Sequence, residues 1–170
     1  MFTMELSGHA IRRATSADRA AIQALFELDP AYFLMNEGAP PRPTEAHDQF
    51  DDLPPDVLPE AQHVLVIDDA RTGVLSVVNG YPDATTWFLG LIFLAPAARG
   101  HGLGARLLDA LADHARAAGG TALRLVVSLA NPRARRLYDR CRFLPIARST
   151  RTTWNGTDVE IDVLERDVTA

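Results

Sequence analysis

The chain has 170 residues, a length typical of one domain with a substantial buried core. Hydrophobic residues make up 47% and charged residues 23%, as in average globular proteins and unlike disordered or fibrous chains. The formal net charge of −5 argues against a nucleic-acid binder, which needs a broad basic surface. All 17 basic residues are arginines, which excludes mechanisms that need a lysine, such as a Schiff base or a P-loop.

Nothing in the sequence indicates a membrane protein or a metal site. The N-terminal residues lack a basic stretch followed by an apolar run, and no apolar run is long enough to cross a bilayer. The sequence therefore predicts a cytoplasmic protein without membrane partners. Cys141 is the single cysteine, so neither an internal disulfide nor a thiolate cluster can form, and we expect it in the core.

The first third of the chain starts with ordered elements and continues in an irregular segment. Ala10 to Arg13 is a predicted short strand, and the capping signal from Thr15 to Asp18 predicts that a helix follows. Residues 29–60 are rich in proline, acidic residues and scattered aromatics. We expect a loop-rich segment there, with one short helix from Thr44 to about Phe50.

The middle of the chain predicts a hairpin followed by a buried strand. The runs His63 to Asp68 and Val74 to Gly80 flank a turn, which is typical of an antiparallel hairpin. Trp87 to Leu94 is almost wholly apolar and ends at Ala95-Pro96, which suits a central strand covered on both faces.

Two helices, a strand and a hairpin complete the predicted elements. Apolar residues recur at helical spacing from the glycines near 100 to about Ala118, and 121–128 is a second buried strand. Asn131 is well placed as the N-cap of a helix that reaches about Cys141. The strand 148–154, an Asn-Gly turn and the alternating residues 158–163 predict a terminal hairpin, which could also pair across a homodimer.

The strongest ligand signal is Arg99-Gly100-His101-Gly102-Leu103-Gly104, between the buried strand and an amphipathic helix. The first turn of a helix exposes amide groups without internal partners, and the peptide dipoles place positive charge there. Glycines let phosphate oxygens come close to the backbone. A glycine-rich turn that only starts a helix explains the same pattern, so the segment does not decide the matter by itself.

Other phosphate-binding patterns fit this segment less well. Gly100-x-Gly102-x-x-Ala105 satisfies a loose dinucleotide-binding pattern, but five residues separate it from the strand, and no acidic residue lies between Asp113 and Asp139 to hold a ribose. The Walker pattern fails because the chain has no lysine. A nicotinamide-dependent oxidoreductase is therefore a third-ranked hypothesis.

Two blocks of residues carry a resemblance to a known family. Arg99-x-x-Gly102-x-Gly104 resembles the acetyl-CoA signature of the GNAT (Gcn5-related) N-acetyltransferase superfamily. Asn131-x-x-Ala134-x-x-Leu137-Tyr138 followed by Phe143 is similar to the family's downstream motif. The blocks cover about residues 87–145, the implied acetyl-CoA core. The resemblance implies one N-acetyltransferase domain over 1–170. Its implied fold is α/β (α+β), with a mixed, mostly antiparallel sheet of six to seven strands, splayed at its centre and flanked by about four helices.

The resemblance also implies which residues bind acetyl-CoA, the acyl donor. The strands 87–94 and 121–128 would splay apart and admit the pantetheine arm, and the glycine-rich segment would hold the pyrophosphate. The implied binding residues are Ile92, Phe93, Leu94, Arg99, Gly100, His101, Gly102, Leu103, Gly104, Ala105, Asn131 and Tyr138. The side chain of His101 is expected to face solvent, and helix capping explains Asn131 equally well.

Direct transfer of an acetyl group to an amine needs a neutral amine, a donor to the developing oxyanion and a proton for the departing thiolate. Tyr138 is the implied general acid, because a tyrosine pKa of roughly 10 suits that task. The backbone amide of Leu94 is the candidate oxyanion donor. A tyrosine on the apolar face of a helix is also a common core residue.

The sequence departs from the family pattern at two positions. Phe88 stands where the strand often carries a glutamate general base, so the base is unidentified; Glu37 and Asp83 are candidate substitutes, although each also fits a solvated loop carboxylate. The missing carboxylate favours a second hypothesis, an acyl-CoA-binding module or sensor without turnover. Arg142 stands where a glycine usually precedes Phe143, so we expect a rearranged turn there.

The acceptor is the least determined part of this interpretation. The sequence leaves open whether it is a small amine or a peptide. Acidic and aromatic residues of the segment 29–60 could line its site, because carboxylates attract ammonium groups. Five arginines crowd the helix after Asn131 and could meet the 3′-phosphate of the donor, although a solvated face explains most of them: Arg133, Arg135, Arg136, Arg140 and Arg142.

Overall fold

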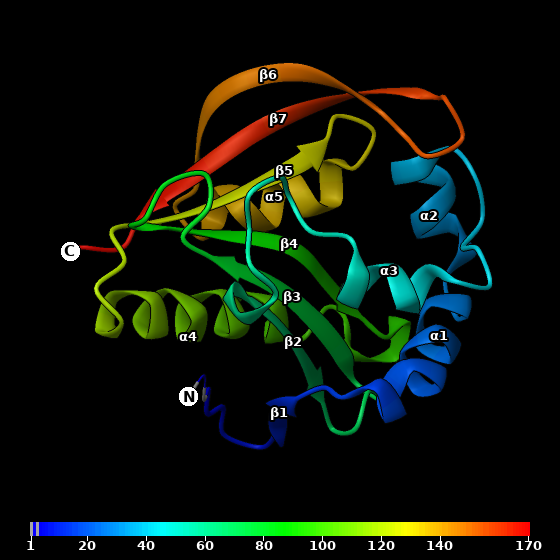
Figure 1. Ribbon diagram of the computed structural model, residues 1–170, viewed down its shortest axis with the longest axis horizontal. Helices are drawn as coiled ribbons and strands as arrows, with labels where there is room; N and C mark the ends of the chain where they lie inside the picture. The colour runs from blue at the N-terminus through cyan, green and yellow to red at the C-terminus, as the bar shows by residue number, and fades with distance from the viewer. Residues whose placement is uncertain (1, 3) are drawn as a thin grey trace.

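The computed structural model describes residue 2 and residues 4–170, which form one seven-stranded sheet with helices on both faces (Figure 1). The strands lie in the order β1-β2-β3-β4-β5-β7-β6, and only β4 and β5 pair in parallel. The strands are β1 (Ile11–Arg13), β2 (Gln62–Ile67), β3 (Gly73–Asn79), β4 (Thr86–Leu94), β5 (Ala122–Ser128), β6 (Leu144–Thr152) and β7 (Asp158–Asp167). The predicted mixed, mostly antiparallel sheet is confirmed.

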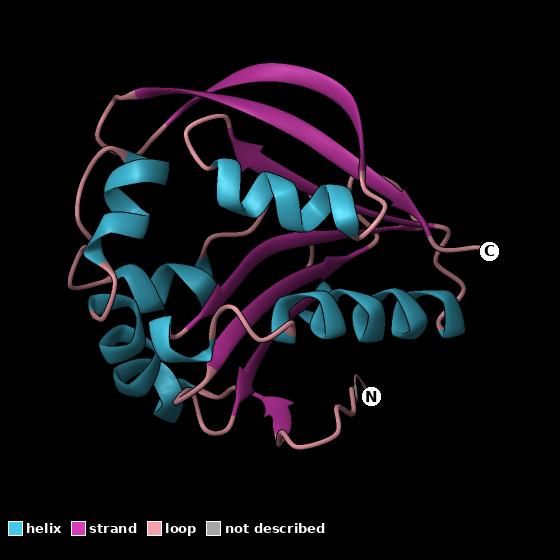
Figure 2. Cartoon of the chain, turned by 180° about the vertical axis from the view of Figure 1, so that it is seen from behind, coloured by secondary structure: helices cyan, strands magenta, loops and turns pink. Residues whose placement is uncertain are grey.

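Five α-helices lie among the described residues: α1 (Arg19–Glu27), α2 (Pro30–Glu37), α3 (Glu45–Asp51), α4 (Leu103–Ala117) and α5 (Pro132–Arg140). Figure 2 shows α4 and α5 on one face of the sheet, while α1 to α3 lie toward the other. Two separate apolar cores match this division, one under α4 and α5 and one under α1 to α3. Within this described part, every helix is too short or too polar to cross a bilayer.

Helix α2 corrects the prediction that residues 29–60 are loop-rich with a single short helix. Asp29 caps its start by accepting a hydrogen bond from the Tyr32 amide, Pro30 occupies the first helical position, and Gly38 ends it at φ 73°. Asp-Pro before and Gly after are ordinary helix boundary signals. The sequence interpretation took the same residues as marks of a loop, so it missed the helix and counted about four helices instead of five.

The two central strands separate along their length, as predicted. β4 and β5 pair only from Thr86 to Leu89 on β4 and from Ala122 to Leu125 on β5. Beyond these residues the two strands have no pairing with each other. The sheet therefore opens between the C-terminal halves of β4 and β5.

A bulge at Gly90 divides β4 into two halves whose side chains alternate in opposite phase, so that equivalent positions face opposite sides of the sheet. Ser76 of β3 pairs with Leu91, whereas Val77 pairs with Leu89, so Gly90 is an extra residue on β4. Because side chains alternate along a strand, one extra residue reverses which face each later side chain covers. Leu89 accordingly packs in the core under α4, while Phe93 packs in the core under α1 to α3. The apolar run of the sequence gave no sign of this reversal.

The terminal hairpin is confirmed, but one of its acidic residues lies inside. The alternation of residues 158–163 predicts Asp162 on the polar side of the strand, but only 5% of it is exposed. Arg135 of α5 and Arg148 of β6 reach it at 2.5 and 2.7 Å. The Arg148 guanidinium holds the pKa of the Asp162 carboxyl below its ordinary value.

Arg142 keeps the turn that a glycine normally makes, which corrects the expected rearrangement. It has a φ of 66°, and its amide donates to the carbonyl of Asp139. The amide of Phe143 donates to the carbonyl of Tyr138, and the rings of these two residues contact edge to face at 5.7 Å. These are the bonds and the apolar contact of a Schellman motif, which fixes the end of α5 despite the strained residue.

We predict that Arg142→Gly stabilises the fold by about 1 kcal/mol, because glycine adopts a positive φ without a steric penalty. Urea unfolding should show a higher midpoint with an unchanged slope. The matched control is Arg136→Gly, an exposed mid-helix position, which should lose about 1 kcal/mol. Equal loss of stability in both variants would contradict the strained turn.

His63 predicts a pH dependence of stability. Burial lowers its pKa to about 4, and its Nδ1 atom has no hydrogen-bond partner among the described residues. An unfolded histidine titrates near pH 6.5, so between about pH 6.5 and 4 the unfolded chain takes up a proton that the folded chain does not. Stability should therefore fall as the pH is lowered through this window.

Denaturant midpoints measured across the window test this expectation. His63→Phe keeps an aromatic ring beside Phe2, which stacks at 4.9 Å, and should flatten the pH dependence. The exposed His47, changed in the same way, should leave it intact. A slope that survives in His63→Phe would assign the pH dependence to other groups.

Candidate functional site

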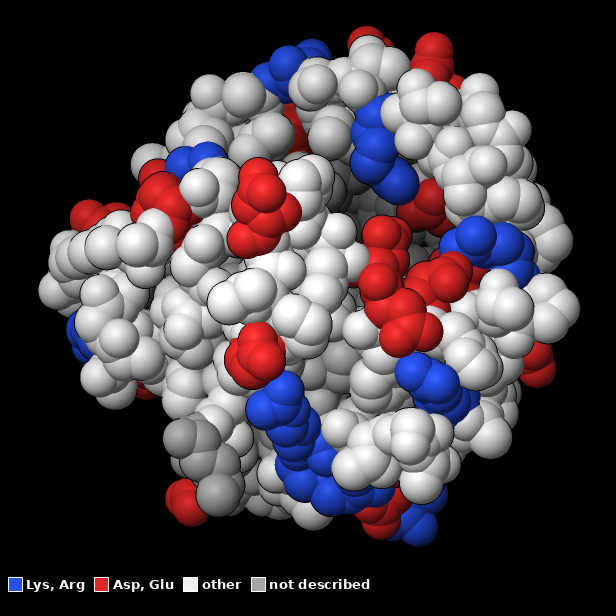
Figure 3. Space-filling model, in the orientation of Figure 1, with Lys and Arg blue, Asp and Glu red and all other residues white. Residues whose placement is uncertain are grey.

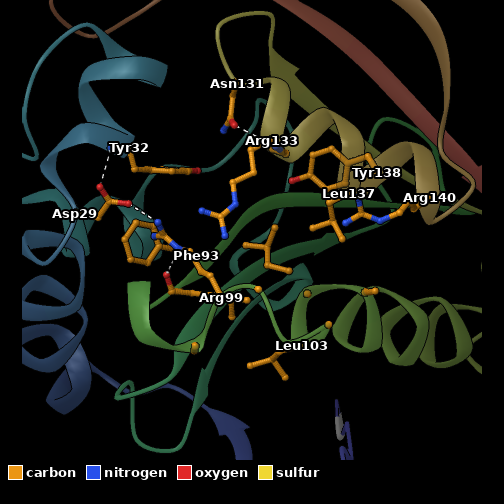
Figure 4. Close-up of a pocket in the computed structure, with 18 of the residues that line it drawn as sticks. Asp29, Tyr32, Phe93, Arg99, Leu103, Asn131, Arg133, Leu137, Tyr138 and Arg140 are labelled. Carbon is orange, nitrogen blue, oxygen red and sulfur yellow. Dashed lines mark hydrogen bonds and ion pairs between the residues drawn. The ribbon is translucent and has the colours of Figure 1, made fainter.

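A cavity of about 510 Å³ opens where β4 and β5 separate, between α2, α5 and the start of α4 (Figure 4). It gathers most of the residues that the sequence singled out as binding residues. Those that line it are Ile92, Phe93, Leu94, Arg99, Gly100, Gly102, Leu103, Gly104, Ala105, Asn131 and Tyr138. His101 is exposed and is not among the lining residues.

The start of α4 presents a row of unpaired amide groups to this cavity. The first helical hydrogen bond runs from the Arg106 amide to the Gly102 carbonyl at 3.2 Å. The amides of residues 100–105 have no hydrogen-bond partner within the described chain. Gly100 and Gly102 have φ of 82° and 78°, and a Cβ on either would meet open space. The turn therefore suits an anion that needs several N–H donors and a close approach to the backbone.

Gly104 is needed for a different reason, because it lies against α5. A Cβ at this position would approach Cδ2 of Leu137 to 3.1 Å. The absence of a side chain lets the first turn of α4 lie close to α5, which forms the other wall of the cavity.

Hydrogen-bond alternation decides which backbone groups of β4 face the cavity. Ala95 donates to the carbonyl of Thr72 at 2.9 Å, so this antiparallel pair is a hydrogen-bonded one. Bonded and non-bonded pairs alternate, so the amides and carbonyls of Leu94 and Ile92 point away from β3 and toward the opening. The same alternation directs the backbone amide and carbonyl of Phe93 to β3. Its ring packs in the core under α1 to α3 and borders the cavity beside Arg99.

Arg99 is fixed in place by three partners. Its Nε donates to the Leu94 carbonyl at 2.8 Å, its Nη1 contacts the Asp29 carboxylate at 2.5 Å, and its guanidinium lies 5.3 Å from the centre of the Phe93 ring. Asp29 also caps α2. Arg99 therefore joins α2 to the end of β4, and its charge is already balanced by a carboxylate.

Helix α5 brings a cap and two cations to the cavity. The Asn131 side chain accepts from the Ala134 amide at 3.1 Å, so the predicted cap is confirmed. Its amide NH₂ group makes no hydrogen bond to another described residue, which leaves it free to donate. Arg133 and Arg140 line the cavity and form no ion pair with any described residue, whereas Arg135 faces Asp162.

Two tyrosine hydroxyls face each other across the cavity. Tyr138 of α5 is 8% exposed, and Figure 4 shows its ring and that of Tyr32 from α2 pointing toward one another. Burial raises the pKa of Tyr32 to about 12 and also raises the pKa of Tyr138, with a smaller contribution from the neighbouring Tyr32. Both hydroxyls therefore keep their protons through the neutral range.

The sequence interpretation missed the contribution of α2. Asp29, Tyr32 and Met35 line the cavity from this helix, although none was a candidate site residue. The boundary signals of α2 could have revealed the helix, but not that it lies opposite α5. That placement depends on the contacts of Phe33 with Phe26 and with Phe93, and Phe93 is 60 residues away in the sequence.

A second cavity of about 440 Å³ lies on the other side of β4. Its floor is formed by the sheet, and its mouth by α2, α3 and the tip of the β6–β7 hairpin. Figure 3 shows this face hollowed, with acidic groups gathered at the rim. Gly90 lines the second cavity and Ile92 the first, so the two cavities approach each other along β4.

The two candidate general bases lie in different places. Glu37 lines the second cavity, but Arg151 of β6 holds its carboxylate at 2.9 Å. Asp83 lines neither cavity and accepts hydrogen bonds from Thr85 and Thr86 in the turn before β4, which lower its pKa. Asp83 thus has a structural explanation within its own turn.

Comparisons with known proteins agree with this architecture. A model of the Acetyltransferase (GNAT) family matches residues 22–143. Mycothiol acetyltransferase of Beutenbergia cavernae is 39% identical over 84 residues, 49% of this chain and 28% of that protein, so the chain spans under a third of that relative. The crystal structure of an acetyltransferase from Thermus thermophilus superposes with a TM-score of 0.75 at 21% identity, covering 97% of this chain and 99% of that one.

A further solved structure is that of spermidine N-acetyltransferase from Vibrio cholerae in complex with CoA and spermine. It superposes with a TM-score of 0.71 at 18% identity, covering 96% of this chain and 98% of that one. Because the family model matches most of the chain, the protein belongs to the GNAT acetyltransferase family, as its two sequence blocks implied. Acetyl-CoA is the acyl donor of this family.

We predict that Gly102→Ala weakens CoA binding about tenfold, because the added Cβ strains a residue at φ 78° and intrudes where phosphate oxygens approach the amides. Gly119→Ala is the matched control, since Gly119 has φ 83° and equally open surroundings at the far end of α4. Both variants should lose similar stability, and only Gly102→Ala should lose affinity by calorimetric titration. Equal affinity in the two variants would remove the amide turn from the binding site.

Proposed function

We propose that this protein is an acetyl-CoA-dependent N-acetyltransferase that transfers an acetyl group to a primary amine in a ternary complex. The observation that carries the proposal is the row of unpaired amides at residues 100–105, facing a cavity that opens between β4 and β5. An anion at the helix N-terminus and an extended chain between the separated strands are what this shape accommodates.

The residues present fit the donor. The amides of residues 100–105 would bind the pyrophosphate, and Arg133 and Arg140 are unpaired cations available to phosphate groups. The backbone amide and carbonyl of Ile92 would take the place of a strand partner for the pantetheine amides. The free NH₂ of Asn131 would donate near the thioester end. Arg99 would act chiefly by fixing Leu94 and α2.

Bound acetyl-CoA supplies an activated acetyl thioester. The Leu94 amide would donate to the acyl oxygen as negative charge develops there, which is the largest stabilising effect in many acyl transfers. Tyr138 would donate its hydroxyl proton to the departing sulfur and recover it from solvent. Its raised pKa keeps that proton in place until the sulfur acquires charge.

The acceptor would enter through the second cavity and meet the thioester at the Gly90 bulge, where the two cavities approach. No acidic side chain of β4 faces the meeting point, since Phe88 and Gly90 occupy that stretch. The ammonium proton would therefore leave to solvent through the mouth of the second cavity. The same lack of a strand carboxylate favours the competing function, an acyl-CoA-binding module without turnover.

Several sequence predictions belong to the same proposal. We propose that residues 1–170 act as one N-acetyltransferase domain in the cytoplasm. The absence of nucleic-acid and membrane partners and a homodimer through the terminal hairpin stay predictions. The net charge of −5 supports the prediction that the protein has no nucleic-acid partner.

Turnover by Tyr138→Phe tests the catalytic assignment. We expect kcat to fall by about a hundredfold with CoA affinity unchanged, because the variant loses only the proton donor. Tyr81→Phe, which removes a hydroxyl outside both cavities, should keep full activity. A loss in Tyr32→Phe but not in Tyr138→Phe would transfer the role to Tyr32. Thiol release absent with every amine, despite CoA binding, would favour the non-catalytic module.

A further inference from the structure

The mouth of the second cavity carries an excess of negative charge. Four carboxylates and two guanidinium groups line it, which leaves two formal negative charges unbalanced. Both cations are already held, Arg42 by Glu45 at 3.1 Å and Arg151 by Glu37 at 2.9 Å. Asp52 is exposed, and its carboxylate makes no bond to another described residue. An entering cation finds a free carboxylate here, whereas an entering anion finds no free cation among the described lining residues.

The floor of the same cavity holds a hydroxyl that is open to the cavity and has no partner within the described chain. Ser76 of β3 is 5% exposed and lines the cavity, and its Oγ makes no hydrogen bond within the described chain. A Cβ built on Gly90 would lie 3.9 Å from this oxygen. Ser76 Oγ is therefore beside the β4 bulge, at the end of the second cavity that is nearest the first.

A hydroxyl at the floor of a cavity that no protein group occupies can accept a hydrogen bond from water or from a bound ligand. A primary amine that reaches the bulge has an N–H to donate to Ser76 Oγ. The hydrogen bond would hold the nitrogen with its lone pair free for the acyl carbon. The second cavity thus offers two different polar partners: the neutral Ser76 hydroxyl at its floor and unpaired carboxylate charge at its mouth.

We infer that the acceptor is an amine with two positive charges: a primary amine that reacts beside Ser76, and a second cationic group held by the carboxylates at the mouth, Asp52 in particular. The inference rests on the proposed function and names its substrate class. In the reaction the acceptor's ammonium first loses a proton to solvent. A C–N bond then forms to the acetyl carbon as the C–S bond breaks, and the nitrogen loses a second proton to solvent to give the amide. The sulfur leaves as a thiol with the Tyr138 proton, and the Tyr138 phenolate recovers a proton from solvent.

A set of three matched acceptors tests the substrate class with the intact protein and acetyl-CoA. The set is an alkylamine, the α,ω-diamine of equal length and the ω-amino acid of equal length, repeated over a series of chain lengths. We expect the diamine to have a kcat/KM at least about tenfold above that of the monoamine, and the amino acid to be the poorest. The advantage should shrink with rising salt, because the mouth is solvent-exposed.

Two variants separate the mouth from the floor. Asp52→Asn should lower kcat/KM for the diamine about threefold to fivefold and leave the monoamine unchanged, since only the second charge is affected. Its control is Glu60→Gln, which removes an equally exposed carboxylate that does not line the cavity. Ser76→Ala should lower kcat/KM about tenfold for diamine and monoamine alike, with CoA affinity and unfolding midpoint unchanged.

The outcomes distinguish this inference from the function on which it rests. Thiol release at equal efficiency with diamine and monoamine, or an equal loss for both in Asp52→Asn, would overturn the dicationic acceptor and leave the acetyltransferase in place. A preference for the ω-amino acid would mean that Arg42 or Arg151 binds the carboxylate of the acceptor, and it would overturn the dicationic acceptor as well. Release absent with every amine would overturn the function and the inference together.

Discussion

The separation of β4 from β5 is the constraint on which the site depends. A strand that is paired on both sides uses its amides and carbonyls in hydrogen bonds to its neighbours. In the second half of β4, by contrast, the backbone groups of Ile92 and Leu94 point toward an opening. The start of α4 adds the unpaired amides of residues 100–105 at the same opening. The cavity thus offers unsatisfied backbone donors and acceptors that an extended, phosphate-bearing ligand can satisfy.

Ion pairs and a helix-terminating motif in and around the walls of the opening hold these walls in place. Asp29 caps α2 and holds Arg99, which in turn binds the Leu94 carbonyl, so one carboxylate links the helix to the end of β4. Arg151 of the terminal hairpin binds Glu37 at the other end of α2. On the opposite wall, the motif at Arg142 fixes the end of α5 and the orientation of Tyr138 against Phe143. These contacts fix the two walls from which Tyr32 and Tyr138 face each other.

In the proposed reaction, the Gly90 bulge would let two cavities on opposite sides of the sheet serve the donor and the acceptor. The bulge reverses which face of the sheet the side chains of β4 cover. The strand therefore presents Phe88 and Gly90 to the second cavity and Ile92 and Leu94 to the first. Donor and acceptor can then approach the same short stretch from different sides. Charge divides in the same way, with unpaired arginines at the first cavity and unbalanced carboxylates at the second.

Local signals in the sequence determined the glycine turn, the Asn131 cap, the amphipathic helices and the family, because each depends on residues within a few positions of one another. Of the twelve binding residues that the family resemblance implied, all but His101 line one cavity. Only the tertiary structure decided the rest: the place of α2 opposite α5, the reversal at Gly90, the pairing of Glu37 with Arg151 and the burial of Asp162 and Ser76. Each of these depends on strand register or on contacts between distant segments, and neither leaves a periodic pattern in the chain.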